Sequence, residues 1–178
     1  MAQLFLGAAV PGLRPNKRHI ATHDSSGKSV YAESPEQEFW GVPNVGGMAR
    51  SYAVSGIPAQ LRDDADLKAY RADEGVTSYS KRDIVVPGNG ANVVVVDIAP
   101  GGVSGMHHTV SIDFSICVMG EIEHELDSGQ KVKLLPGVSF MMWSKTMELI
   151  LSRITLYNEA RCISGSMPRR LSRLDSWL

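Results

Sequence analysis

The sequence has few cysteines, no long apolar run and no excess of charge of either sign, and each absence excludes a class of protein. Its 178 residues include two cysteines, Cys117 and Cys162, which are too few for a disulfide framework and are not spaced as a CxxC site. This usage favours a reducing compartment. A net charge of -1 leaves no basic surface of the kind that binds nucleic acid or anionic membranes. No apolar run is long enough to span a bilayer.

The beginning of the chain is apolar but does not have the pattern of a secretory signal. No basic segment precedes the apolar residues, and Pro11 and Gly12 end them after a very short stretch. We therefore expect an edge strand or a loose arm here, and a cytoplasmic protein. With 43% hydrophobic residues and no internal repeat, the chain is long enough for one domain with a real core.

Residues 1–85 are predicted to form an arm, a hairpin and a connecting segment. Two β-prone runs flank turn residues 24–27, so residues 18–32 are expected to form the hairpin. Residues 33–47 are rich in proline and glycine and are predicted to be loop, with Phe39 and Trp40 as packing anchors. Residues 57–70 carry apolar side chains at roughly helical spacing, which indicates one short helix or a loop with its aspartates in water.

From Asn92 onward the sequence becomes typical of an all-β barrel or sandwich. Short strands ended by glycine, proline or polar turns are predicted at residues 92–98, 112–119, 121–126 and 131–135. The third of these alternates strictly, with glutamates on one face and Ile122, His124 and Leu126 on the other. Residues 86–137 are therefore the predicted core of the domain.

The spacing of glycines, histidine and aspartate in this core resembles the first motif of the cupins, G-x5-H-x-H-x3-E-x6-G. The chain has Gly101, His107, Thr109, Asp113 and Gly120 at the five motif positions, with every spacing kept. Threonine stands for the second histidine, and aspartate stands for the glutamate. The resemblance implies a double-stranded β-helix, or jelly-roll, barrel with a small-molecule ligand inside it.

The run from Met106 to Asp113, together with residues 18–28, resembles a subgroup of small fungal and bacterial cupins in which M-H-x-T replaces H-x-H. Members of this kind recur in fungal polyketide gene clusters. The resemblance implies a cupin-domain oxidoreductase of secondary metabolism that acts on a small, polyketide-derived or aromatic intermediate. The alternatives are a non-redox decarboxylase, dehydratase or isomerase, a metal-free binding or accessory cupin, and a chain that is inactive as written. A homodimer is the expected assembly.

The candidate site residues are His107, Asp113 and Thr109. Side chains two residues apart on a strand point to the same side, so His107 and Thr109 should point together and His108 should point away. His107 is expected to be a metal ligand or a catalytic base, Asp113 a weak ligand or base, and Thr109 a hydroxyl that orients the substrate. The cofactor would be a divalent ion such as iron, manganese, nickel or zinc. His124 is expected to be a core or pocket histidine.

The tail departs from the cupin pattern after Gly137. The family has an aspartate, a β-run and a second-motif histidine there, but no histidine follows His124 in this chain. We therefore expect two closing strands and one metal ligand to be missing, which would leave the barrel incomplete at its C-terminus. Read one base out of register from Arg153 onward, a consistent choice of codons spells the missing motif. Our hypothesis is that residues 138–178 are an aberrant tail, produced by an unspliced intron and a shifted frame.

This hypothesis makes a prediction about the mature transcript across the codons for Gly137 to Arg153. We expect reverse-transcribed message to lack the bases that encode Val138 to Ser152, so that the frame continues into a second-motif histidine. Genomic DNA amplified with the same primers is the control. A message that retains these bases contradicts the hypothesis and removes the second histidine from the metal-enzyme interpretation.

Overall fold

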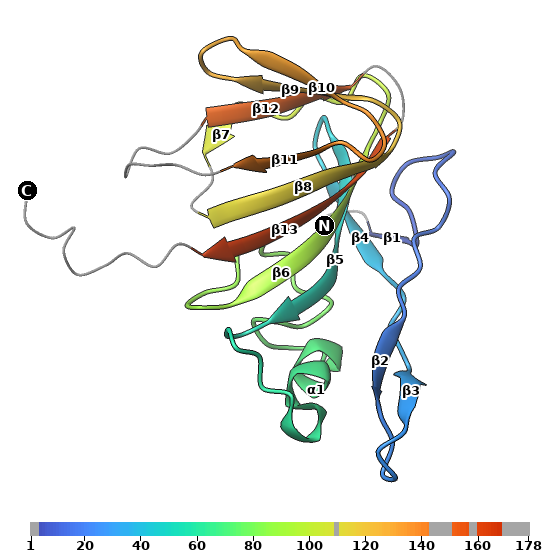
Figure 1. Cartoon of the computed structure of the whole chain (residues 1–178). Helices are drawn as coiled ribbons and strands as arrows, with labels where there is room; N and C mark the ends of the chain where they lie inside the picture. Colours follow the sequence, from blue (N-terminus) through green and yellow to red (C-terminus); the bar gives the residue numbers. More distant parts are fainter. Residues whose placement is uncertain (1–3, 109–110, 143–150, 157–159, 169–178) are drawn as a thin grey trace, which may run out of the picture.

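The computed structural model describes residues 4–108, 111–142, 151–156 and 160–168, which form mostly antiparallel strands (Figure 1). The one described α-helix, α1, follows a short 3-10 helix at Arg62–Asp64, and no described helix is long and apolar enough to cross a membrane. In chain order the elements are β1 (Leu4–Leu6), β2 (Ile20–His23), β3 (Ser29–Ala32), β4 (Glu38–Val42), β5 (Gly46–Val54), α1 (Ala65–Arg71), β6 (Ala91–Ile98), β7 (His107–His108), β8 (Ser111–Met119), β9 (Ile122–Leu126), β10 (Lys131–Leu134), β11 (Ser139–Met142), β12 (Leu151–Leu156) and β13 (Ala160–Pro168).

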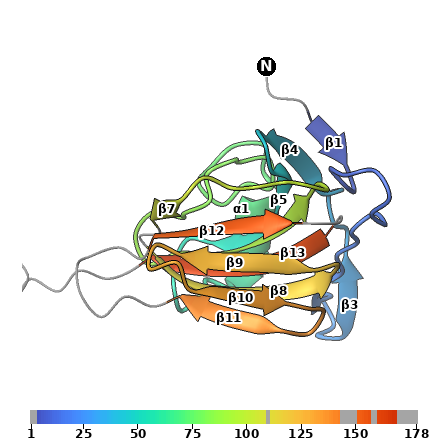
Figure 2. The same ribbon diagram turned by 90° about the horizontal axis from the view of Figure 1, so that it is seen from above.

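The strands form two larger sheets that face each other across the interior of a jelly-roll barrel (Figures 1 and 2). The seven-stranded sheet has the order β1-β4-β5-β6-β13-β8-β11, and the four-stranded sheet has the order β10-β9-β12-β7. Strands β2 and β3 pair only with each other and stand away from the barrel (Figure 1). The all-β barrel and the hairpin predicted from the sequence are both confirmed.

Strand β6 lies near the middle of the larger sheet and packs on both of its faces, which explains its nearly continuous run of valines. Val95 packs on the outer face with Phe39 and Ala49, beneath the N-terminal segment. The inner face belongs to the main core, whose buried members are Val94, Val96, Ile98, Cys117, Ile122, Leu134, Ala160 and Cys162. A strand that is buried on both faces is stabilised by apolar residues in both alternating sets, which the four valines of β6 supply.

The two glycines of the cupin-like motif sit where the backbone needs a positive φ. Gly101 has a φ of 71° and Gly120 a φ of 74°, a region in which side chains other than glycine are strained. Gly101 lies in the turn after β6, and Gly120 lies in the turn between β8 and β9. The motif glycines therefore lie in the turns that follow β6 and β8.

The N-terminal half agrees with the sequence in part. Residues 4–6 form an edge strand beside β4, and Phe39 is fully buried as a packing anchor. The helix predicted within residues 57–70 is α1, which buries Leu67 and Tyr70. The prediction that residues 33–47 are loop is wrong, because β4 and the start of β5 lie there. Strand β4 pairs with β1 and with β5, and β5 pairs with β6. The hydrogen bonds to β1 and β6, which lie far away in the sequence, outweigh the local preference of proline and glycine for loops.

The expectation that the tail contributes no closing strands is also wrong. Strands β11, β12 and β13 all lie after Gly137, and β13 is hydrogen-bonded between β6 and β8 in the larger sheet. A strand in that position satisfies its backbone groups on both sides, so serine and glycine are tolerated along it despite their weak preference for strands. Residues 143–150 and 169–178 of the tail lie outside the described residues.

A buried ion pair joins β13 to β6 and to the N-terminal segment. Arg161 donates to both carboxylate oxygens of Asp97, at 2.6 and 2.9 Å, and Asp97 is fully buried. The same carboxylate accepts a hydrogen bond from the backbone N–H of Ala9 at 2.8 Å. The guanidinium also donates to the carbonyl oxygen of Arg14 at 2.6 Å. Two strands and the segment that covers them therefore depend on one pair of charges.

Asp97→Ala should destabilise the fold strongly, because it leaves the Arg161 guanidinium buried without its carboxylate. Breaking a buried pair in this way typically costs about 3–5 kcal/mol. Urea unfolding followed by circular dichroism measures the loss. Lys131→Ala is the control, since it removes only the exposed pairs with Glu123 and Glu125 and should leave the midpoint nearly unchanged. Equal midpoints for the two variants would show that the Asp97 pair does not hold the barrel together.

Candidate functional site

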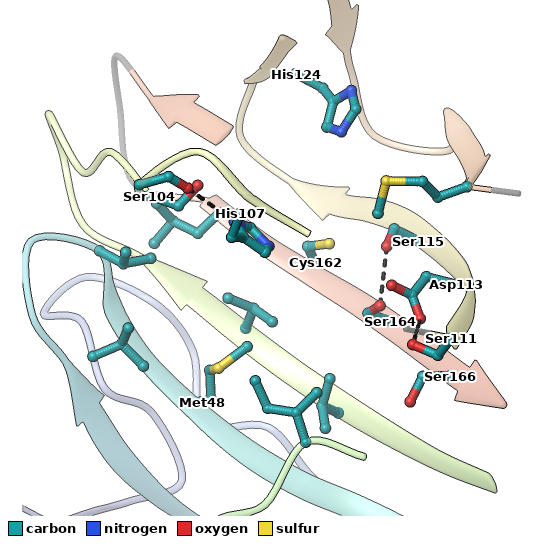
Figure 3. Close-up of a pocket in the computed structure, with 18 of the residues that line it drawn as sticks. Met48, Ser104, His107, Ser111, Asp113, Ser115, His124, Cys162, Ser164 and Ser166 are labelled. Carbon is teal, nitrogen blue, oxygen red and sulfur yellow. Dashed lines mark hydrogen bonds between the residues drawn. The ribbon is translucent and has the colours of Figure 1, made fainter. Parts of the chain in front are cut away.

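A cavity of about 510 Å³ lies inside the barrel and is large enough for a small ligand (Figure 3). Its wall comes from strands of both larger sheets and from the loop that leads into β7. Most of the lining is apolar, including Val42, Val45, Met48, Val94, Val96, Ile98, Phe140 and Met142. The polar side chains of the lining are Ser104, His107, Ser111, Asp113, Ser115, His124, Ser164 and Ser166.

His107 lies on β7, at the edge of the smaller sheet, and its exposed side chain lines the cavity. Its Nδ1 atom lies 2.9 Å from the carbonyl oxygen of Gly105. A carbonyl oxygen can only accept, so this hydrogen bond places a proton on Nδ1 and leaves Nε2 as the nitrogen available to a ligand. The structure therefore supports His107 as a cavity residue whose ring is held by the backbone.

His124 lies on β9 and is the more deeply buried of the two cavity histidines, with 5% of its surface exposed. Its ring packs on Phe140 with 4.3 Å between the centroids. Its Nε2 atom is buried and has no hydrogen-bond partner among the described residues. A core histidine without a function would normally have such a partner, so the missing one points to a ligand. The prediction that His124 is a core or pocket histidine is confirmed.

The surroundings of His124 keep its imidazole neutral. Burial lowers the pKa of His124 below its ordinary value, and the nearby His107 ring lowers it further. A neutral imidazole has one nitrogen that accepts and one that donates. His124 can therefore accept a proton from a bound molecule, or hydrogen-bond to it, without first losing a proton to water.

Asp113 lies on β8 in the wall opposite β9, where 8% of its surface is exposed. It accepts a hydrogen bond of 2.7 Å from the hydroxyl of Ser111. Figure 3 shows Asp113 at the serine-rich end of the cavity and His107 toward the other end. Both residues line one cavity, as expected, but from different sheets and different ends. Thr109 lies outside the described residues.

The donor set was compared with the metal site that the motif implies. Among the residues that the structure describes, no group of three histidine, cysteine, aspartate or glutamate side chains is placed to hold a metal ion. His107 and His124 supply two imidazoles, but Asp113 does not join them as the carboxylate of a two-histidine, one-carboxylate site. The described residues therefore do not fit that site.

The serines of the cavity wall were not predicted from the sequence. Strand β8 turns Ser111, Asp113 and Ser115 toward the cavity, while Phe114 and Ile116 on its other face are 44% and 43% exposed. Polar and apolar residues alternate strictly along this part of β8, and this pattern places the polar side chains on one face of the strand. The sequence predicts the strand but not that its polar face points inward, because apolar residues usually face a core.

The relatives found by sequence comparison are fungal proteins. The chain is 36% identical over 135 residues to "Phomopsin biosynthesis cluster protein D" of Diaporthe leptostromiformis, which covers 71% of this chain and 66% of that protein. It is 31% identical over 122 residues to the "Cupin-domain-containing oxidoreductase virC" of Hypocrea virens, which covers 67% of this chain and 59% of that protein. The chain thus spans two thirds or less of the length of these curated relatives.

Other comparisons add little to these relatives. No family model matches the chain. A cupin superfamily protein from Desulfitobacterium hafniense aligns with a TM-score of 0.40 and 14% identity, over 44% of this chain and 68% of that one. The motif spacing, the jelly-roll barrel and the named fungal relatives agree, and the chain therefore belongs to the cupin superfamily.

Proposed function

We propose that the protein is an enzyme of fungal secondary metabolism that oxidises a small, polyketide-derived intermediate inside the barrel. The observation that carries the proposal is His124, a buried, neutral histidine that lines the apolar cavity and whose Nε2 has no hydrogen-bond partner among the described residues. The setting is supported by the names of the relatives, which include cupin-domain-containing oxidoreductases and biosynthesis cluster proteins.

In this proposal the cavity walls bind and desolvate the substrate, and the histidines handle its proton. Met48, Val96 and Phe140 pack on the apolar body of the substrate and exclude water. His124 accepts a proton from a substrate hydroxyl or from an acidic C–H bond, since its imidazole is neutral. The oxidant in this proposal is dioxygen, which takes up two electrons and two protons from the substrate and leaves as hydrogen peroxide. His107 lies at the exposed side of the cavity, with Nδ1 held by Gly105, and hydrogen-bonds a second polar group of the substrate through Nε2.

A second candidate is a non-redox reaction, such as an isomerisation or dehydration, in the same cavity. Two observations favour it: His124 is suited to move a proton, and the described residues do not gather three metal ligands. Proton transfer between two positions of a substrate needs only a base and an acid of suitable pKa. The two candidates therefore share the cavity and His124 and differ in whether an electron acceptor is consumed.

Gene replacement followed by assay of the purified protein tests the proposal. Deletion of the gene in its source organism should cause one small, largely apolar compound to accumulate, as measured by liquid chromatography and mass spectrometry. The purified full-length chain should convert that compound in air and should fail to convert it when dioxygen is removed. Equal conversion with and without dioxygen would overturn the oxidase proposal and favour the non-redox candidate. An unchanged metabolite profile would contradict both candidates.

His124→Asn should lower the turnover of that compound by about 100-fold or more, because a positioned general base typically contributes 10²–10⁴-fold. Asparagine keeps a hydrogen-bonding group in the cavity but cannot take up the proton. Glu123→Gln is the matched control, since the neighbouring side chain points to the other face of β9 and pairs with Lys131. Turnover of His124→Asn close to that of the control would remove His124 from the mechanism.

The lowered pKa of His124 also predicts how stability depends on pH. An unfolded histidine titrates near pH ~6.5, while folding holds His124 neutral to a lower pH. The stability linked to this group is therefore fully present above about pH 6.5 and is lost as the pH falls through the folded-state value. Urea midpoints of the wild type should fall more steeply between about pH 7 and pH 5 than those of His124→Asn. Parallel curves would show that the burial of His124 does not shift its titration.

A further inference from the structure

The register of the larger sheet arranges the cavity wall in rows of increasing polarity. Facing residues on β6, β13 and β8 form three neighbouring rows, each read across the three strands. The first row is Val96, Cys162 and Cys117, the second is Val94, Ser164 and Ser115, and the third is Asn92, Ser166 and Asp113. All of these residues except Cys117 and Asn92 line the cavity. The wall therefore changes from apolar, through mixed, to fully polar over a few residues of strand.

The polar rows are hydrogen-bonded internally. The Ser166 hydroxyl donates to the side-chain oxygen of Asn92 at 2.5 Å, and the Ser115 hydroxyl donates to the hydroxyl oxygen of Ser164 at 3.0 Å. A hydroxyl that accepts a hydrogen bond still has its own hydrogen to donate. Ser164 can therefore donate to an oxygen atom of a molecule in the cavity, at the point where the wall turns from apolar to polar (Figure 3).

Ser115 and Ser166 are buried, with 6% of the surface of each exposed, at strand positions where valine is the more usual residue. Their hydrogen bonds within the wall satisfy these hydroxyls and leave the hydrogen of the Ser164 hydroxyl available to a ligand. His124 is an independent sign that the cavity takes a ligand, since its buried Nε2 has no partner among the described residues. The serine rows and His124 come from opposite sheets and face one cavity.

The charge of the lining limits what can bind. No lysine or arginine is among the described residues that line the cavity, and Asp113 is the one acidic side chain there. A carboxylate, sulfate or phosphate group would therefore lose its water without gaining a cation. His124 is held neutral by burial and does not supply that charge.

We propose that the cavity selects an uncharged molecule with an apolar body and a hydroxyl or carbonyl group at one end, and that Ser115 and Ser164 recognise this group. This inference deepens the proposed function by naming the class of substrate, and it rests on that function only for the claim that the ligand is a substrate. The apolar body lies against the valine and methionine side of the wall. The oxygen atom of the ligand accepts a hydrogen bond from the serine row.

Two probes with the same aromatic body test this selection: 2-naphthol, which is uncharged at neutral pH, and 2-naphthoate, which is an anion. Calorimetric titration of the purified full-length chain should give at least about tenfold tighter binding of 2-naphthol. Ser115→Ala and Ser164→Ala should each weaken the binding of 2-naphthol by about three- to tenfold, the effect of losing one hydrogen bond. The control is Ser139→Ala, which makes the same change at an exposed position of β11.

The outcomes separate this inference from the proposed function. Equal affinity for the two probes, no binding of either probe, or an unchanged affinity in both serine variants would overturn the selection rule. Thermal unfolding of each variant shows whether the fold is kept, and a lost affinity counts only where the unfolding midpoint stays close to that of Ser139→Ala. If the probes are selected as expected while gene deletion leaves the metabolites unchanged, the proposed reaction fails and the ligand class stands.

Discussion

The buried ion pair between Asp97 and Arg161 is the interaction on which the rest of the structure depends. The two residues face each other across β6 and β13, so the pair aligns the strands in one register. A slip by one residue would bury a charge without its partner and would turn every side chain of β13 to the opposite face. The residues next to the pair, Val96 and Cys162, form the first row of the cavity wall. The geometry of the cavity therefore follows from the position of one pair of charges.

The same pair also explains why the N-terminal segment lies on the barrel. The backbone N–H of Ala9 donates to the carboxylate of the pair, and the guanidinium donates to the carbonyl oxygen of Arg14. These hydrogen bonds of the pair form only when this segment is in place. The segment in turn covers Val95 and Phe39 on the outer face of the larger sheet. The same segment thus buries apolar surface on that face and completes the burial of the ion pair, so the two effects are coupled. The inner face is left free to carry the polar groups of the site.

Much of the barrel could be predicted from local sequence, because strand β6, strand β8 and the β9-β10 hairpin are bounded by glycine or proline and have clear strand patterns. Gly101 and Gly120 fixed the motif because their positive φ angles leave little choice of residue. Strands β4 and β13 could not be predicted in the same way. Strand β4 pairs with β1 as well as with the adjoining β5, both partners of β13 are far away in sequence, and local composition favours loop at both places.

The site was harder to predict than the fold, for a physical reason. A motif identifies the residues that a family uses, and the two motif residues His107 and Asp113 both line the cavity. The motif does not include His124, which stands out because it is buried and because its Nε2 has no hydrogen-bond partner among the described residues. Neither property can be read from the alternation of β9 alone, since an inward histidine with a partner would give the same pattern. The serines of β8 had a visible pattern, but their meaning depended on knowing which face lines a cavity.

The site divides into two parts that differ in how they depend on the tail. His107, Asp113, Ser115 and His124 all precede Val138 and lie on strands β7, β8 and β9, of which β7 and β9 pair with β12 of the tail. Cys162, Ser164 and Ser166 come from β13, within the segment that the transcript hypothesis assigns to a shifted frame. A different last strand would change the middle member of each row while leaving both outer members in place. The two serine variants therefore report on different things: Ser115 probes a wall that belongs to the barrel under either frame, and Ser164 probes the strand that this chain supplies.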